Sequence, residues 1–156
     1  MEVRVLWVGK TQEDYLREGL NIFKSRLKRY LDFKTVVIKG EKIPPGARTE
    51  PLLKREEQRI LEALEPADKV VVLDPKGKAM GSMEFSKFLG GLQDQGIRSL
   101  VFVLGSSMGL GPAVTDRAEF RISLSPMTFT HEMARLILLE QIFRAMTILK
   151  GEKYHK

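Results

Sequence analysis

Cysteine is absent from the 156-residue sequence, and histidine occurs only at His131 and His155. Without thiols the chain can form no disulfide, and a zinc site built on thiolates is excluded. No short-spaced pair of histidines or acids stands out either, so we expect no bound metal. The absence of cysteine is consistent with a reducing compartment, and we expect a cytoplasmic protein.

Long apolar runs are also missing. No stretch approaches the roughly 20 apolar residues of a membrane-spanning helix, so we expect no membrane contact. The start of the chain, MEVRVLWVGK, lacks the basic region, apolar run and cleavage site of a signal peptide. The length, with 43% hydrophobic and 29% charged residues, predicts one compact domain over residues 1–156.

Three common motifs are incomplete. Gly9-Lys10-Thr11 resembles the end of a phosphate-binding P-loop, but Arg4 stands where that motif needs its first glycine. The glycines from Gly105 to Gly111 do not have the GxGxxG spacing, and GxSxG is absent. These gaps argue against a nucleoside triphosphatase, a nicotinamide enzyme and a serine hydrolase. Group transfer or binding with an organic cofactor remains.

Positive charge is in excess, with a formal net charge of +6. Polyanion binding is one explanation, and a basic soluble protein without such a partner is the other. Aromatic residues are few among the basic ones, which argues against single-strand binding by base stacking on an open sheet.

Strand and helix patterns alternate along the chain. Short apolar runs predict strands at 3–8, 33–38, 70–73, 100–104 and 122–124, and helices are expected at about 11–30, 51–64, 82–95, 113–117 and after 130. Thr11 and Ser82 are the expected N-caps of the first and third helices. Alternation of this kind, with strands apolar on both sides, predicts an α/β fold with a parallel sheet and helices on both faces.

Glycine and other small residues follow three of the predicted strands, in the loops 73–78, 105–111 and 124–129. Ligands of open α/β sheets bind outside the carboxyl ends of the strands, so the three loops should share one edge. Small residues there would let backbone amides approach a ligand closely. The alternative is that the glycines only make turns.

The C-terminal helix is apolar most of the way round, so we expect it to be covered on more than one side. His131 and Arg135 share one stripe of this helix, and Glu140 and Arg144 lie nearly opposite. Two interpretations of Glu140 and Arg144 remain open: the residues bind a specific partner or ligand, or they form a simple ion pair along the helix. For His131, the alternative to a functional role is a purely structural place at the start of the helix, with Thr128 or Thr130 as the N-cap. For the tail ending Tyr154-His155-Lys156, the alternative to a functional role is a frayed end.

Together, several motifs resemble the bacterial ribosomal RNA large subunit methyltransferase H family, of the SPOUT class. The resemblance runs from end to end and is carried by Asp14-Tyr15, LDPKGK at 73–78, the Gly105 loop, LSPMT at 124–128, His131, LILLEQIFRA at 136–145 and the terminal YHK. It implies a SPOUT-type α/β fold with a C-terminal trefoil knot, a rare exception to the rule against threaded connections. It also implies a homodimer with the active site at the subunit interface.

The resemblance further implies the reaction and its residues. Family enzymes use S-adenosyl-L-methionine to methylate N3 of a pseudouridine in helix 69 of 23S ribosomal RNA, in the assembled ribosome. By position, Leu73, Gly105, Leu124, Ser125, Pro126, Met127, Thr128 and Phe129 would bind the cofactor, His131 and Glu140 the substrate, and Arg144, Tyr154 and His155 would be catalytic. Two alternatives remain: a non-catalytic ribosome-binding factor that retains the fold, and a SPOUT methyltransferase acting on transfer RNA.

The sequence departs from the family pattern at four places. Ser106-Ser107 follows Gly105 where the family commonly continues with Gly-Ala or Gly-Pro, and Pro112 stands where polar residues are more usual. Thr130 replaces a frequent proline, and Phe143 replaces a frequent tyrosine. We expect a slightly altered cofactor loop that still binds.

Overall fold

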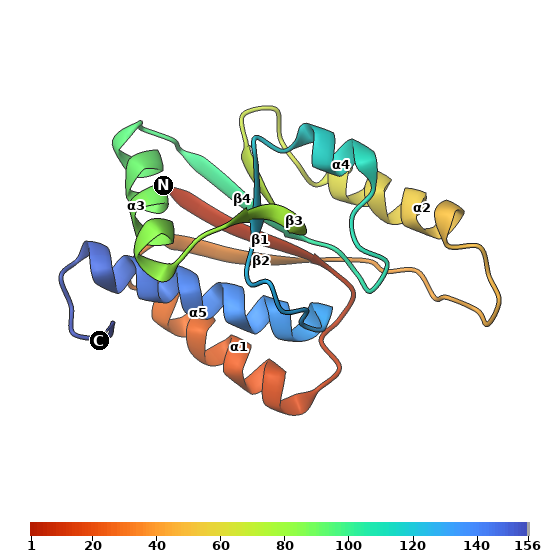
Figure 1. Cartoon of the computed structure of the whole chain (residues 1–156), viewed down its shortest axis with the longest axis horizontal. Coiled ribbons are helices and arrows are strands. Elements are labelled where there is room, and N and C mark those ends of the chain that lie inside the picture. Colours follow the sequence, from red (N-terminus) through yellow and green to blue (C-terminus); the bar gives the residue numbers. More distant parts are fainter. Residues whose placement is uncertain (156) are drawn as a thin grey trace.

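A computed structural model describes residues 1–155, which form a five-stranded sheet with helices on both sides (Figure 1). In chain order the elements are β1 (Glu2–Val8), α1 (Asp14–Leu27), β2 (Asp32–Ile38), α2 (Thr49–Glu62), β3 (Lys69–Ala79), α3 (Ser82–Asp94), β4 (Ser99–Leu104), α4 (Pro112–Arg117), β5 (Phe120–Ser123) and α5 (His131–Leu149). The strand order is β2-β1-β4-β3-β5, and every pairing is parallel. The predicted α/β fold is confirmed.

Each face of the sheet has its own apolar core. On one face lie α1, α3 and α5 (Figure 1). They cover Trp7 and Phe102, and α5 contributes Leu138, Leu139 and Ile142, which are all fully buried. On the other face α2 and α4 pack on the alternate strand residues, such as the valines of β3 and β4. Strands covered on both sides bury every side chain, which is why their sequences are apolar without alternation.

The predicted N-caps Thr11 and Ser82 are wrong, because neither side chain caps its helix. Thr11 is buried, and its hydroxyl accepts a hydrogen bond from the Arg135 guanidinium at 2.9 Å. The Ser82 hydroxyl donates to the side-chain oxygen of Gln141 at 2.7 Å. In both cases a long-range contact with α5 takes the place of a local cap.

β3 is longer than predicted, because the strand resumes its pairing with β5 after an irregular segment. Leu73 and Lys78 both pair with Ile122, so residues 74–77 form a bulge between them. A Cβ added to Gly77 would lie 2.6 Å from the backbone carbon of Ile122 and 2.7 Å from that of Arg121. The two backbones therefore cross in direct contact at Gly77, where only glycine fits.

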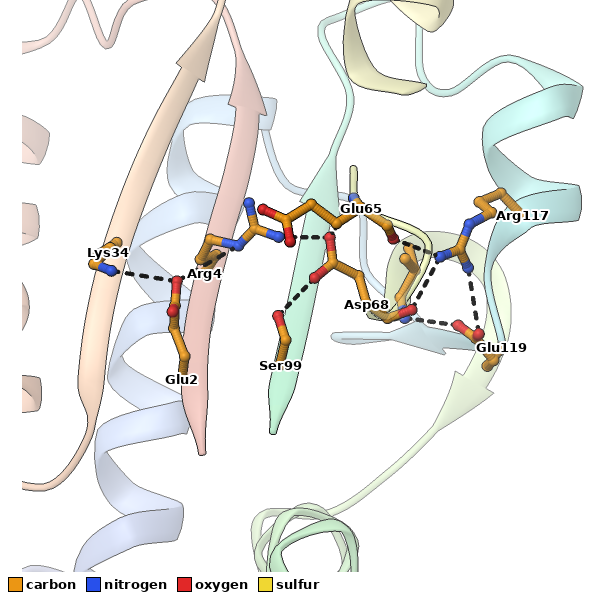
Figure 2. A network of polar contacts seen from close by, with 9 residues as sticks. Glu2, Arg4, Lys34, Glu65, Asp68, Ser99, Arg117 and Glu119 are labelled. Atoms are coloured by element: carbon orange, nitrogen blue, oxygen red, sulfur yellow. Dashed lines mark hydrogen bonds and ion pairs between the residues drawn. The ribbon is translucent and has the colours of Figure 1, made fainter. Parts of the chain in front are cut away.

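The amino ends of the strands carry a polar network (Figure 2). The buried carboxylate of Asp68 accepts hydrogen bonds from Arg4 at 2.5 Å, from the Ser99 hydroxyl at 2.6 Å and from the Glu65 amide at 2.7 Å. Arg117 donates to the backbone carbonyls of Glu65 and Asp68. This network joins β1, β3 and β4 at the edge opposite their carboxyl ends, so it stabilises the sheet away from the predicted ligand loops.

The described part of the chain contains neither a candidate membrane helix nor a candidate metal cluster. No helix within residues 1–155 is long and apolar enough to cross a membrane. No group of three or more histidine, aspartate or glutamate side chains in the same range could hold a metal ion.

Candidate functional site

A cavity of about 1060 Å³ opens at the carboxyl ends of the strands. All three predicted loops line it. They contribute Leu73, Asp74, Pro75, Lys76, Gly105, Ser106, Ser107, Gly109, Leu110, Leu124, Ser125, Pro126, Met127, Thr128 and Phe129. The cavity is at the upper end of the volume range of small-molecule sites. The prediction that the loops share one edge is confirmed, and every predicted cofactor residue lies there.

The Gly105 loop folds back on itself. The Gly109 amide donates to the Ser106 carbonyl at 2.9 Å, and Gly109 has a φ of +80°, in the region that favours glycine. A Cβ on Gly105 would lie 2.3 Å from the Gly109 carbonyl oxygen. The glycines therefore permit a tight turn and also keep the cavity wall free of side chains at these positions.

The loop 124–129 is shaped by its serine. The Ser125 hydroxyl accepts a hydrogen bond from the Met127 amide at 2.9 Å, and the Ser125 carbonyl accepts from the Ser123 hydroxyl at 3.1 Å. Met127 and Phe129 are exposed, with 76% and 38% of their surface accessible. Two large apolar side chains at the mouth of a cavity are available to cover a bound ligand.

His131, the first residue of α5, lies in the same cavity. Burial lowers the pKa of His131, and the charge of Arg135 acts in the same direction, while Glu132 and Glu56 oppose them. The imidazole is therefore neutral near pH 7, and one ring nitrogen can accept a hydrogen bond while the other donates.

Two departures from the family pattern have a structural reason. Thr130 is the N-cap of α5, and its hydroxyl accepts a hydrogen bond from the Met133 amide at 3.2 Å. This confirms one of the two expected capping residues. Pro112 is the first residue of α4, where proline is favoured because its missing N–H would have no partner.

The start of α5 also fixes the connection between β1 and α1. Arg135 is fully buried and donates to the Val8 carbonyl at 2.6 Å, while the Glu132 carboxylate accepts from the amides of Gln12 and Glu13 at 2.6 and 3.3 Å. Glu13 lines the cavity, which the sequence analysis missed. The signal was available, because β1 is parallel to β3 and β4 and ends at the same edge.

Four predicted residues form a second cluster, where the tail that follows α5 folds back against the second half of this helix. The Arg144 guanidinium donates to Glu140 at 2.5 Å and to His155 Nδ1 at 3.3 Å, and it lies 4.9 Å from the centre of the Tyr154 ring. The Tyr154 hydroxyl donates to Glu140 at 3.3 Å. Burial and Glu140 raise the pKa of Tyr154 despite Arg144 and Arg26, so its hydroxyl stays protonated and remains a donor.

The tail from residue 151 to residue 155 is docked against the protein. The Tyr154 ring packs edge-on against Phe143, with centroids 4.8 Å apart. The Tyr30 hydroxyl donates to the Glu152 carboxylate at 2.6 Å. These residues do not form the frayed end that was the alternative, whereas Lys156 lies outside the described residues. Phe143 is buried in this aromatic packing, where a ring without a hydroxyl leaves no polar group to satisfy.

The two groups of predicted residues do not meet within one chain. His131 and Arg144 belong to the same helix, and thirteen steps of α-helix span about 20 Å. None of Glu140, Arg144, Tyr154 and His155 is among the residues that line the cavity. The structure thus presents a cavity and a separate charged cluster at the two ends of α5.

Comparison with known proteins identifies the family. Residues 1–155 match the model of the family described as "Predicted SPOUT methyltransferase". The chain is 42% identical to the ribosomal RNA large subunit methyltransferase H of Halothermothrix orenii, and both chains are covered completely. It is 44% identical to the protein of the same name from Symbiobacterium thermophilum, again over both full lengths.

Solved structures give the same fold. A probable methylase family protein from Haemophilus influenzae Rd KW20 superposes with a TM-score of 0.60 at 11% identity, covering 99% of this chain and 70% of that one. A probable methyltransferase from Bordetella pertussis Tohama I gives 0.56 at 13% identity, covering 93% and 96%. These identities show the fold alone, but the full-length relatives show more: the chain belongs to the SPOUT methyltransferases, in the ribosomal RNA large subunit methyltransferase H family.

Proposed function

We propose that this enzyme transfers a methyl group from S-adenosyl-L-methionine to N3 of a pseudouridine in helix 69 of 23S ribosomal RNA. The relatives' names support ribosomal RNA as the substrate. The observation that carries the proposal is the convergence of three strand-end loops on one cavity. A net charge of +6 suits a polyanionic substrate such as the assembled ribosome, and we propose a cytoplasmic enzyme because that substrate is cytoplasmic.

The cavity residues fit the proposed cofactor. Leu73 and Leu124 offer apolar surface, and Gly105 leaves backbone groups accessible. The carboxylates of Glu13 and Asp74 complement the positive charge of a sulfonium and an α-amino group. When bound, the cofactor supplies an electrophilic methyl carbon, and the protein contributes position and electrostatics.

We propose a homodimer because one chain leaves its two functional groups apart. The outward side of α5 is half-buried, and it carries Met133, Ile137, Glu140, Gln141, Arg144 and Ile148. A two-fold contact along this stripe would bury its apolar members. Such a contact would also allow the Arg144 cluster of one protomer to face the cavity of the other, so that each active site is shared.

The charged cluster suits deprotonation of the pseudouridine N3–H. Arg144 would stabilise the negative charge that develops on the neighbouring carbonyl oxygen, and Glu140 would hold the guanidinium in place. Tyr154 would stack on the base. His155 is the proposed base, but its Nδ1 accepts from Arg144 in this structure. It can take a proton at Nδ1 only when Arg144 turns toward the substrate.

We also propose the trefoil knot of the family. The support is the crossing at Gly77, where residues 74–77 pass over β5 and β3 resumes its pairing on the far side. The bulge that makes this crossing also supplies the cavity lining at Asp74, Pro75 and Lys76, so the knot and the cofactor site would share a segment.

The test of function is transfer of labelled methyl from S-adenosyl-L-methionine to ribosomes that lack the modification. Free large subunits and bulk transfer RNA are assayed in parallel, and the label is mapped in the RNA. Label at pseudouridine N3 of helix 69 is expected. Label on transfer RNA would contradict the substrate, and no label on any RNA by a folded dimer would favour the non-catalytic ribosome-binding factor.

Replacing Arg144 with alanine tests the role of the cluster. We expect methyl transfer to fall about 100-fold or more, because a preorganised donor to the developing anion is lost. Cofactor affinity, measured by calorimetry, should stay unchanged. The matched control is Arg98→Ala, at the opposite edge of the sheet, which should keep full activity. Loss of cofactor binding in the Arg144→Ala protein would show that this role is wrong.

A further inference from the structure

Helix α2 carries two consecutive carboxylates, Glu56 and Glu57, that contact the segment Gly105–Ala113 at both of its ends. We propose that these two side chains are positioning residues. They hold this segment, which contains the Gly105 loop, in the conformation that binds the cofactor before the cofactor arrives. The inference rests on the proposed function for the identity of the ligand. It concerns residues that do not line the cavity themselves.

Glu56 is the anchor at the start of the loop. Its side chain is buried, with 1% of the residue surface exposed, and its two oxygens accept from the Ser106 hydroxyl at 2.7 Å and from the Glu41 amide at 2.9 Å. No lysine or arginine of the described residues lies within 4.0 Å of this carboxylate. A buried carboxylate without a cationic partner depends on its hydrogen bonds, so separation of Ser106 from Glu56 is costly.

Ser106 transmits this constraint into the loop. Its hydroxyl proton points to Glu56, which leaves the oxygen free to accept from the Met108 amide at 3.3 Å. Its backbone carbonyl accepts from the Gly109 amide. One residue therefore joins α2 to the inside of the turn, and an alanine at this position would keep the turn but lose the tie to α2.

Glu57 holds the other end. Its carboxylate accepts from the Ala113 amide at 2.8 Å, which is one of the amides left without a partner at the start of α4. A Cβ on Gly111 would lie 2.1 Å from the same carboxylate oxygen, so the side chain sits directly against the backbone. With both ends fixed, the loop loses little further freedom when a ligand binds, and preorganisation of this kind favours affinity.

Amide hydrogen exchange of the cofactor-free protein tests the constraint directly. Glu56→Gln retains one acceptor oxygen but turns an NH2 group toward a donor, and Ser106→Ala removes the hydroxyl. Both variants should exchange about tenfold faster at Met108 and Gly109, with unchanged exchange in the sheet. The control Glu62→Gln changes an exposed carboxylate of the same helix and should exchange like the parent. Unchanged exchange in both variants would overturn the proposal.

Cofactor binding gives a second, independent readout. By calorimetry, each variant should bind S-adenosyl-L-methionine about tenfold more weakly, and the double variant no more weakly than the worse single one. In turnover assays the KM for cofactor should rise while kcat at saturation stays constant. Additive losses, or a fall in kcat alone, would refute the positioning role. Failure of the parent protein to bind the cofactor would instead contradict the proposed function, and the exchange result would still decide whether the constraint exists.

Discussion

Asp68 offers the sharpest test of what holds the sheet together (Figure 2). Alanine at this position removes three acceptor contacts and leaves the Arg4 guanidinium, with 14% of its side chain exposed, without its main partner. Breaking one side of a buried ion pair costs about 3–5 kcal/mol. Glu2 still lies 3.7 Å from Arg4, so we expect the lower end, about 3 kcal/mol. For a domain of this size that lowers Tm by about 6–12 °C.

Urea unfolding at pH 7, supported by thermal scans, measures this loss. The control is Asp32→Ala, which removes an exposed carboxylate 3.8 Å from Lys34 at the same edge and should change the free energy of unfolding by less than about 0.5 kcal/mol. A loss below about 1 kcal/mol for Asp68→Ala would show that desolvation of the pair cancels its hydrogen bonds, and the reasoning would fail.

The same site makes a prediction about pH. Burial alone would raise the pKa of Asp68, but hydrogen bonds from Ser99, the Glu65 amide and Arg4 outweigh it and lower the pKa. A depressed folded-state pKa contributes stability above the unfolded value of about 3.9, and this contribution disappears as pH falls through the folded value. The stability difference between the parent and Asp68→Asn should therefore shrink from pH 7 to pH 3. An equal or larger difference at pH 3 would contradict the sign.

Two further substitutions test the crossing and the anchor of α5. Gly77→Ala should lower the free energy of unfolding by about 3 kcal/mol, because its Cβ meets the β5 backbone, whereas the control Gly91→Ala, in open space on α3, should stabilise by up to about 1 kcal/mol. Arg135→Met should cost about 1–3 kcal/mol, because the Val8 carbonyl and the Thr11 hydroxyl lose their donor. Urea denaturation measures all three proteins, and a neutral Gly77→Ala or Arg135→Met would refute the respective contact.

The sequence predicted the elements well where the signals were local. Apolar runs of strand length and the glycine and proline residues between them placed all five strands and the parallel sheet. The N-cap roles predicted for Thr11 and Ser82 were wrong because both side chains instead contact α5, more than fifty residues away along the chain. The extension of β3 was missed for a similar reason, since residues 74–79 become a strand only through pairing with β5.

The site divides in the same way. Loops at the ends of parallel strands converge by topology alone, so the cavity residues could be predicted, and helix periodicity separated His131 from Arg144 correctly. The carboxylates Glu56 and Glu57 could not be recognised, because KREE at 54–57 reads as a solvent-facing stretch of helix. Only the packing of α2 beside the Gly105 loop shows that Glu56 is buried.

The two sides of α5 place different demands on anyone who would redesign this enzyme for another RNA. Its inward residues, such as Leu138 and Ile142, close the main core, and truncating any of them to alanine would cost about 2–5 kcal/mol. Its outward positions, such as Ile137, Gln141 and Ile148, are half-buried and make no comparable contribution to that core. Libraries confined to the outward positions would therefore leave this core intact, and what they would put at risk is the proposed two-fold contact, so each variant would need its oligomeric state measured beside its specificity.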